Sequence, residues 1–358
     1  MARERLCLGI DIGASSVKLC QLKRGKRGTV LVHFGLVPLP SEAIVDGALM
    51  NASKVVEAIQ ELVTSHGIRH KEVALSVSGH SVIIKKIPLP KMTPEELEES
   101  IHYEAEQFIP FDIKDVNIDV QIVNAESAQA GQMDVVLVAA KKDLVNEYTS
   151  AIVEAGLLPV ICDVDAFAVE NMFSANYDVP KDKTIALVNV GASKTNINIL
   201  SKGISSFTRD LTTGGNAFTE EIQKQLNVPF DEAEGAKIAS SALMSDKTQT
   251  TSTGHMQATA NALNSVAESI TTEVQRSVDF YSATSADPPP AQIYLTGGSA
   301  RLTALSQAIE RRIGVPVSVA DPFRNIQVAE ADREFVRGIG PAAAVAVGLA
   351  LRFPGDGR

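Results

Sequence analysis

A strand–turn–strand pattern occurs twice in this chain, and it limits the possible folds more than any other feature of the sequence. Residues 6–20 read as an apolar strand, a short Gly-Ala-Ser-Ser turn and a second strand with alternating apolar residues. Residues 185–200 repeat the arrangement at an offset of 178 residues, which aligns Asp11 with Asn189 and Lys18 with Asn196. Unrelated turns rarely repeat in this way, so the sequence predicts two similar halves.

The turn of the first copy carries residue types that bind phosphate together with a metal ion. Asp11 interrupts an otherwise apolar strand, and a buried carboxylate is costly unless it meets a cation or several donors. The small residues 13–16 allow main-chain N–H groups to face an anion, and Lys18 adds a positive charge. An ordinary hairpin whose aspartate caps the turn explains the first copy alone equally well. The second copy favours the phosphate interpretation.

The length and composition indicate a folded protein with more than one domain. At 358 residues the chain exceeds one compact core, and 45% hydrophobic with 21% charged residues is typical of folded soluble proteins. The longest apolar run, Pro341–Leu351, is too short to span a bilayer, so we expect a cytoplasmic protein without direct membrane insertion. A net charge of −10 and the absence of Trp argue against a nucleic-acid partner.

The cysteines and histidines form no catalytic or metal-binding pattern. The three cysteines stand singly in apolar surroundings and are expected to be buried free thiols: Cys7, Cys20 and Cys162. The six histidines show no ligand spacing and are expected at the surface or in turns. The sequence contains no Ser/His/Asp arrangement, no P-loop and no Gly-x-Gly-x-x-Gly fingerprint at a strand-to-helix junction. Any ligand site is therefore expected at the glycine turns.

Two further glycine turns stand beside strands and helix starts. Gly214-Gly215-Asn216 precedes a helix expected at residues 217–226, whose N-terminus would carry a partial positive charge towards an anion. Gly297-Gly298-Ser299 follows a short buried strand and precedes a helix expected at residues 302–313. With the duplicated turns they favour a nucleotide held between mixed sheets of an α/β protein. Ser245–Thr253 is expected to be a mobile loop, and Pro341–Leu351 a closing helix.

Residues 88–157 differ in pattern and are expected to form an inserted helix–strand–strand–helix subdomain. Thr93-Pro94-Glu95-Glu96 is a strong helix start, with an N-cap Thr, Pro at the first helical position and Glu at the third. The helix is expected to run to about Gln107. Its aromatic corner, Phe108–Phe111, is more often a small core than an exposed groove for a partner.

The duplicated turn, the Thr-Gly-Gly-Ser at 296–299 and the Ala/Gly-rich closing helix together resemble the actin-like, sugar-kinase and heat-shock-chaperone ATPase superfamily. The resemblance implies an actin-like (ribonuclease-H-like) α/β fold of two domains with duplicated mixed sheets. The first domain would combine residues 1–87, 158–183 and 335–358, and the second residues 184–212 and 290–334. An FtsA-type subdomain would be inserted at 88–157, and residues 213–289 would form a helical subdomain over the nucleotide.

By the same resemblance, ATP and Mg²⁺ lie between the domains. Asp11 would orient the metal ion through water, and Lys18 would contact phosphate. Phosphate would be held by the first loop (Gly13, Ala14, Ser15, Ser16), the second loop (Gly191, Ala192, Ser193, Lys194) and the turn of Gly214, Gly215 and Asn216. The nucleoside would be surrounded by Glu234, Lys237, Gly297, Gly298 and Ser299.

The resemblance leaves the hydrolytic activity open. Asp165 and Glu170 are candidates for the group that activates water, although each is equally explained as a helix cap or a surface residue. Asn189 stands where many superfamily members carry a second carboxylate. An amide hydrogen-bonds but cannot act as a base, so ATP binding with slow or negligible turnover is expected.

Within the superfamily the chain most resembles the PilM family, cytoplasmic actin-like proteins of bacterial type IV pilus machines. The match rests on residues 8–13, 105–111, 163–168 and 211–215, and the glutamate-rich helix that ends in Phe-Ile-Pro-Phe is the most specific part. The FtsA family has a comparable insertion but ends in an amphipathic membrane helix. The tail at residues 352–358 cannot form such a helix.

This resemblance implies an ATP-binding scaffold at the cytoplasmic face of the inner membrane. Its partner would be the cytoplasmic N-terminal tail of PilN, held in a groove beside the inserted subdomain. The scaffold would couple the assembly platform to the motor, with PilO, PilP, PilC and PilB as direct or indirect partners, and self-association is a further expectation. The alternatives are an FtsA-like polymerising cell-division protein and a sugar-kinase-type phosphotransferase, which would need an acceptor pocket and an aspartate base.

Overall fold

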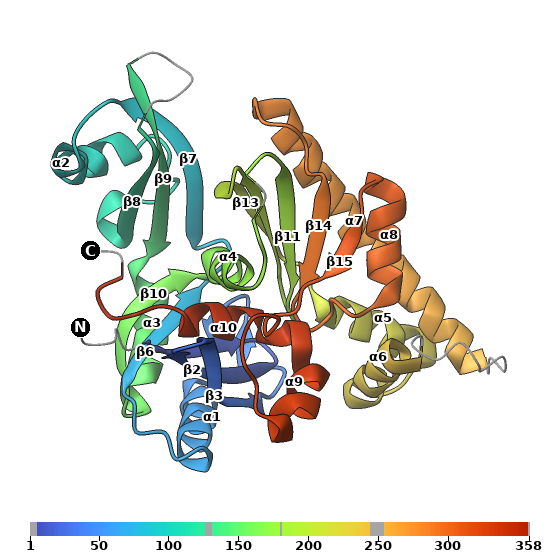
Figure 1. Cartoon of the computed structure of the whole chain (residues 1–358). Helices are drawn as coiled ribbons and strands as arrows, with labels where there is room; N and C mark the ends of the chain where they lie inside the picture. Colours follow the sequence, from blue (N-terminus) through green and yellow to red (C-terminus); the bar gives the residue numbers. More distant parts are fainter. Residues whose placement is uncertain (1–5, 126–130, 180, 244–253, 357–358) are drawn as a thin grey trace.

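Two five-stranded sheets of the same topology form the centre of the molecule. The computed structural model describes residues 6–125, 131–179, 181–243 and 254–356. The strand order is β10-β6-β1-β2-β3 in the first sheet and β13-β12-β11-β14-β15 in the second. In each sheet a three-stranded antiparallel meander continues through two parallel strands. The duplicated α/β architecture predicted from the repeat is therefore confirmed (Figure 1).

The strands follow the predicted apolar segments closely. The first sheet contains β1 (Leu8–Gly13), β2 (Ser16–Gly25), β3 (Gly28–Pro38), β6 (Glu72–Val77) and β10 (Leu158–Val164). The second contains β11 (Thr184–Val190), β12 (Thr195–Ser201), β13 (Ile204–Leu211), β14 (Gln292–Thr296) and β15 (Val317–Val319). The register repeats as well, because Asp11 pairs with Lys18 in the first hairpin and Asn189 with Asn196 in the second.

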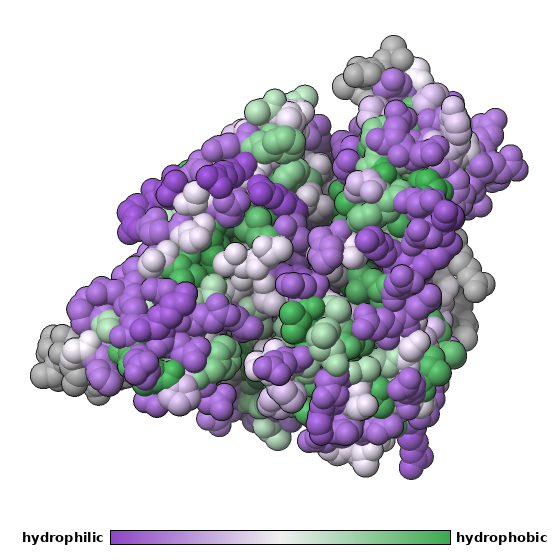
Figure 2. Space-filling model, turned by 180° about the vertical axis from the view of Figure 1, so that it is seen from behind, coloured by the Kyte–Doolittle hydropathy of each residue, from purple (hydrophilic) through white to green (hydrophobic). Residues whose placement is uncertain are grey.

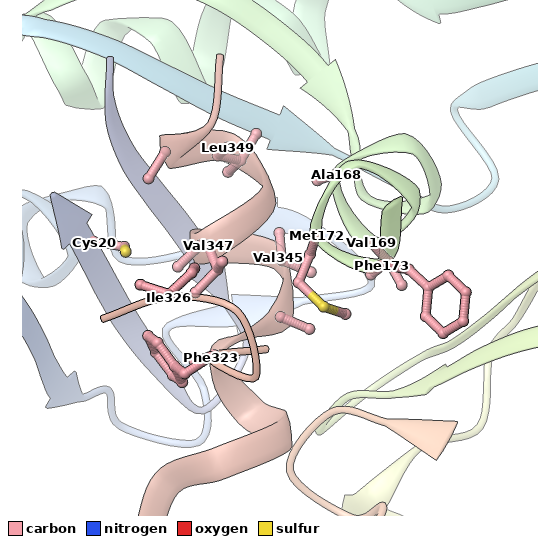
Figure 3. Close-up of a cluster of buried hydrophobic side chains, with 14 of the residues drawn as sticks. Cys20, Ala168, Val169, Met172, Phe173, Phe323, Ile326, Val345, Val347 and Leu349 are labelled. Carbon is pink, nitrogen blue, oxygen red and sulfur yellow. The ribbon is translucent and has the colours of Figure 1, made fainter. Parts of the chain in front are cut away.

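Helices cover both faces of the first sheet. On one face, α1 (Ala52–Ser65) and α3 (Lys142–Glu154) bury their apolar sides with Leu8, Ile10 and Leu75. On the other face, α4 (Asp165–Asn176) packs with α10 (Ala344–Ala350) (Figure 3). α3, which the sequence pattern assigned to the insertion, thus contributes its buried residues to the core of the first domain.

The packing of α10 depends on two glycines. A Cβ at Gly9 of β1 would lie 2.3 Å from the Ala346 carbonyl oxygen, and a Cβ at Gly348 would lie 1.7 Å from that of Ala168. Backbone therefore rests directly on backbone at both places. The predicted single helix at 341–351 is wrong at its start, because residues 340–343 form a 3₁₀ turn. The Pro341 carbonyl accepts hydrogen bonds from the Gly297 N–H and the Thr296 hydroxyl, which compete with the α-helical bond.

The inserted subdomain has its own sheet and core. Its strands, in the order β7-β9-β8, are β7 (Val82–Pro90), β8 (Val116–Asn124) and β9 (Gln132–Lys141), with η1 (Ile113–Asp115) before β8. The helix α2 (Pro94–Ala105) begins with the predicted capping box at Thr93 and ends two residues before Gln107. Ile109 is buried, and Phe108 and Phe111 pack partly buried against the same core, so the aromatic corner is a small core.

The remaining helices cover the second sheet and the connections. They are α5 (Gly215–Leu226), α6 (Phe230–Leu243), α7 (Gly254–Thr284), α8 (Thr303–Ile313) and α9 (Arg333–Ile339). Short elements that the sequence did not predict include β15, α9, the two-residue strands β4 (Ile44–Val45) and β5 (Ala48–Leu49), and η2 (Glu330–Asp332). The predicted mobile loop, Ser245–Thr253, lies outside the described residues. No helix in the described ranges has both the length and the apolarity to cross a membrane.

One burial prediction was wrong, and one residue expected at the surface or in a turn is buried. Cys7 and Cys20 are buried, but Cys162 is exposed, because it lies on β10, an edge strand. His70, expected at the surface or in a turn, lies in the connection before β6 but is buried, with its Nε2 atom 3.9 Å from the Glu72 carboxylate. A single polar residue in the sequence does not indicate which neighbour will satisfy it.

Candidate functional site

The first half of the site is the end of the β1–β2 hairpin. Lys18 Nζ donates to Asp11 Oδ2 at 3.0 Å, and both side chains are largely buried. Burial raises the pKa of Asp11, the Lys18 charge opposes this, and the charge of Asp165 adds to it. A carboxylate in this environment is stabilised by added positive charge, which is what a cation supplies. Lys18, predicted to contact phosphate, has Asp11 as its partner here.

The two candidate water-activating residues occupy different places. Asp165, at the start of α4, accepts a 2.6 Å hydrogen bond from Ser76 Oγ and is close enough to raise the pKa of Asp11. Glu170, one turn further along α4, accepts from Asn198 Nδ2 on β12 at 3.2 Å. The structure therefore brings Asp165 to the Asp11 half of the site, whereas Glu170 lies in the contact between α4 and the second sheet.

The second half is built around the β11–β12 turn. The Gly191 N–H donates to the Lys194 carbonyl at 2.9 Å and closes the turn. The N–H groups of Gly215 and Asn216, at the start of α5, donate to the carbonyls of Gly191 and Ala192 at 2.7 Å each. These two donors of the helix N-terminus are thus already used by the protein.

Close packing explains the glycines at the start of α5. A Cβ at Gly214 would lie 2.7 Å from the backbone atoms Gly191 O, Ala192 O and Lys194 N. A Cβ at Gly215 would lie 2.4 Å from Ser299 Oγ. Gly214 and Gly215 therefore bring the helix directly onto the second loop and position it, and the prediction that they face an anion stays a prediction.

The predicted nucleoside residues gather at the same place. Gly297 has φ of +88°, and a Cβ there would lie 2.4 Å from the Val190 carbonyl oxygen. The Ser299 N–H donates to that same carbonyl at 3.2 Å. Lys237 Nζ donates to the Gly215 carbonyl at 3.1 Å and lies 2.6 Å from Glu234 Oε2. Nothing lies within 4 Å of the position of a Cβ at Gly298, so this glycine faces open space.

The sequence interpretation missed a carboxylate on the third strand of the second meander. Asp210 Oδ1 accepts from Asn196 Nδ2 at 2.8 Å, and Asn196 Oδ1 accepts from Asn189 Nδ2 at 2.9 Å. The other carboxylate oxygen of Asp210, Oδ2, accepts a hydrogen bond from the N–H of Gly79, a residue of the first domain, at 2.6 Å. Loss of solvation at its carboxylate raises the pKa of Asp210, although the residue as a whole is exposed. No pattern within the polar strand β13 marks Asp210, because its partners Gly79 and Asn196 lie elsewhere in the chain.

A second missed residue is Arg301, two residues after the Gly297-Gly298-Ser299 turn. Its guanidinium donates to the carbonyls of Arg337 and Gly338, the latter at 3.0 Å. It also lines a hollow of about 650 Å³ together with Pro341. Arg301 thus ties the turn to the segment that returns to the first domain.

A separate hollow of about 870 Å³ lies between the inserted subdomain and the second domain. Its walls come from β7 and β9 on one side and from β13 and the end of α7 on the other. Figure 2 shows this furrow from behind, with apolar residues on both sides. It contains none of the predicted site residues, so it is distinct from the predicted nucleotide site at the two hairpin turns.

The metal-binding capacity of the described residues is limited. Within residues 6–125, 131–179, 181–243 and 254–356, no group of three or more His, Cys, Asp or Glu residues could hold a metal ion. A single buried carboxylate such as Asp11 fits Mg²⁺ that keeps most of its water and is bound mainly through phosphate oxygens. The predicted water-mediated role of Asp11 at a metal ion stays a prediction.

Comparison with known proteins identifies the family. The family model for type IV pilus assembly protein PilM matches residues 9–353. The chain belongs to the PilM family. A solved PilM–PilN type IV pilus biogenesis complex contains a chain that is 29% identical, with a TM-score of 0.84 and 98% of each chain covered. Type IV pilus assembly is therefore the process to which this PilM-family chain belongs.

More distant matches agree with the fold. The cell division protein FtsA of Pseudomonas aeruginosa is 23% identical over 351 residues, covering 89% of this chain and 84% of FtsA. The structure of MreB5 of Spiroplasma citri bound to ADP is 13% identical, with a TM-score of 0.52 and coverage of 96% and 94%. The actin-like fold predicted from the sequence is confirmed by these similarities.

Proposed function

We propose that this PilM-family chain is a nucleotide-binding scaffold of the type IV pilus assembly platform. It binds Mg²⁺–ATP between its two hairpin turns and binds the cytoplasmic N-terminal tail of a PilN-type partner. The observation that carries the nucleotide part is that Gly215 packs on the second loop, Gly297 and Ser299 pack on the Val190 carbonyl just before it, and Lys237 binds the Gly215 carbonyl. Closely packed backbone turns beside the buried ammonium group of Lys237 suit the binding of a phosphorylated ligand.

In this proposal each half of the site has its own task. Asp11 orients hydrated Mg²⁺, and Lys18 moves between the carboxylate and a phosphate oxygen. The second loop supplies main-chain donors, and Lys237 with Glu234 lies at the nucleoside. Asn189 is engaged with Asn196 and offers no base, which supports binding with slow turnover.

Calorimetric titration with ATP, with and without Mg²⁺, tests the nucleotide part. Asp11→Ala is expected to abolish the Mg²⁺-dependent component, because it removes the buried carboxylate. Asp119→Ala serves as the control, since Asp119 is an exposed aspartate of the inserted subdomain. Equal affinity of wild type and Asp11→Ala in the presence of Mg²⁺ would show that the metal lies elsewhere.

The partner part draws on the solved PilM–PilN complex and on an open strand edge. β10 is an edge strand of the first sheet and lies beneath the inserted subdomain (Figure 1). Leu158, Val160 and Cys162 alternate along it and are exposed. An extended tail can add to such an edge through main-chain hydrogen bonds and place alternate side chains on the apolar stripe. PilO, PilP, PilC and PilB would be reached through this contact or independently.

Binding of a synthetic PilN-type N-terminal peptide, with and without ATP, tests the partner part. Val160→Asp is expected to weaken binding at least tenfold, because it places a charge on the apolar stripe. Val32→Asp is the matched control, since Val32 is similarly exposed on β3, the opposite edge of the same sheet. Equal effects of the two substitutions would exclude β10 as the docking edge.

A further inference from the structure

Lys194, at the end of the second loop, reaches into the first domain. Its Nζ atom donates to the Ser78 carbonyl at 2.9 Å. Two glycines of the first domain make room for it: a Cβ at Gly79 would lie 2.5 Å from Nζ, and a Cβ at Gly47 would lie 2.7 Å away. Gly47, Ser78 and Gly79 thus form an ammonium pocket that belongs entirely to the opposite domain.

Asp210, also in the second domain, binds the same turn of residues 78–79. Its carboxylate accepts the Gly79 N–H at 2.6 Å. Two charged residues of the second domain, Lys194 and Asp210, therefore bind two adjacent residues of the first. Hydrogen bonds that involve an ionised group are about twice as strong as neutral ones, so this pair is a specific contact between the domains.

The turn formed by Ser78 and Gly79 has a special position in the chain. It connects β6, in the central sheet of the first domain, directly to β7, the first strand of the inserted subdomain. The Val82 N–H, at the start of β7, donates to the Gly79 carbonyl at 2.9 Å. A change in the contacts of this turn therefore affects the point at which the inserted subdomain joins the first domain.

We propose that Lys194 and Asp210 latch the second domain onto the 78–79 turn, and that the phosphate groups of bound nucleotide release the latch by taking Lys194 from the ammonium pocket. This inference rests on the proposed nucleotide site and adds a regulatory step to it. A phosphate oxygen carries formal charge and the Ser78 carbonyl does not, so phosphate is the stronger acceptor for the ammonium. With Lys194 withdrawn, the turn loses one of these two contacts with the second domain and keeps the one to Asp210, and the inserted subdomain gains freedom where it joins the first domain.

If Lys194 acts as this latch, loss of its pocket in the first domain should increase the affinity for nucleotide. Because the ammonium pocket and phosphate compete for Lys194, destroying the pocket should tighten nucleotide binding by removing the competing state. Gly79→Ala destroys the ammonium pocket, because the new Cβ displaces the flexible end of Lys194. It changes no residue of the phosphate loops. We expect it to bind Mg²⁺–ATP about three- to tenfold more tightly. Lys194→Met, which loses the ammonium itself, should bind more weakly.

Gly156→Ala is the matched control for Gly79→Ala. Both glycines have a positive φ, +82° and +99°, but nothing lies within 4 Å of a Cβ at Gly156. This variant carries the same kind of backbone strain without touching Lys194, so its nucleotide affinity should equal that of wild type. Tighter binding in both variants would assign the effect to strain and overturn the latch.

Hydrogen exchange measured by mass spectrometry provides the second readout. In wild type, Mg²⁺–ATP should speed exchange of the peptide covering residues 78–84 about tenfold, because the turn is released. Lys194→Met should exchange at the fast rate with or without nucleotide. Unchanged or slower exchange in nucleotide-bound wild type would overturn the latch while leaving the proposed function intact. Absence of binding to wild type in calorimetry would overturn the proposed function and this inference with it.

Discussion

Glu170 makes the folded protein sensitive to pH near neutrality. It lies on α4, and its carboxylate accepts a 3.2 Å hydrogen bond from Asn198 Nδ2 on β12. Burial raises the pKa of Glu170 from 4.5 to about 7; the bond from Asn198 opposes this shift, and the charge of Asp163 adds to it. The folded protein thus binds a proton at pH 6 that the unfolded chain has released.

The sign and size of the effect follow from proton linkage. A carboxyl group whose pKa is raised by folding contributes stability below its unfolded pKa and loses it as pH rises through the folded pKa. A difference of about 2.5 in pKa corresponds to about 3 kcal/mol. Because Glu170 is partly exposed, solvent screening reduces this, and we expect a loss on the order of 2 kcal/mol between pH 4.5 and pH 8.

Glu170→Gln isolates this contribution. Gln keeps an acceptor for Asn198 but carries no charge at any pH, so the variant should be more stable than wild type at pH 8 by about 2 kcal/mol. Below pH 5 the two proteins should agree. Urea denaturation at a series of pH values from 5 to 8 measures both curves. Glu98→Gln, on the exposed side of α2, is the control. Its free energy of unfolding should change with pH as that of wild type does.

The reasoning would be refuted by parallel stability curves for wild type and Glu170→Gln. Such a result would mean that Glu170 is ionised in the folded protein at pH 6 and that water or an unrecognised cation satisfies it. If Glu170→Gln instead stabilises the protein as expected and also leaves the rate of nucleotide turnover unchanged, Glu170 is a structural residue and not the group that activates water.

Two further pairs of substitutions test the packing. Gly348→Ala should destabilise the protein by about 3 kcal/mol or more in thermal unfolding, because its Cβ meets a backbone carbonyl that cannot move aside. Gly338→Ala is the control. Nothing lies within 4 Å of a Cβ there, so this variant should have unchanged or slightly increased stability in the same assay. Arg352→Met should cost about 3 kcal/mol in urea denaturation, because it leaves the buried carboxylate of Asp163, now 2.7 Å from Arg352, without its charged partner. Arg333→Met, which breaks an exposed pair, should cost less than about 0.5 kcal/mol.

The repeated strands were predictable because their signal is local. Apolar residues alternate or run continuously through β1, β2, β11 and β12, and the turns between them carry the same small residues. Matching positions in a repeat must take matching places in a duplicated fold, so the pairing of Asp11 with Lys18 could be transferred to Asn189 and Asn196. The capping box at Thr93 was predictable for the same reason, since all its atoms lie within one turn.

The partners of polar groups were not predictable, because they come from distant parts of the chain. Gly214 and Gly215 look like a helix start that faces an anion, but the donors they position are used by the second loop. Lys194 was assigned to phosphate, and its partner in the structure is a carbonyl 116 residues away. Asp210 was missed because its role depends on Gly79 and Asn196, which no local pattern connects to it.

The glycine contacts of α10 also determine where the molecule can bend. With Gly9 and Gly348 seated on backbone, α10 cannot slide along β1 or α4 without a steric clash, so it moves as one body with the first domain. The preceding 3₁₀ turn is bound to the second domain through the Pro341 carbonyl. A rotation of one domain against the other would therefore change the backbone between Gly340 and Ala344, one of the places where the chain passes between the domains. We expect this short segment to act as a hinge, together with the connection from α4 to β11.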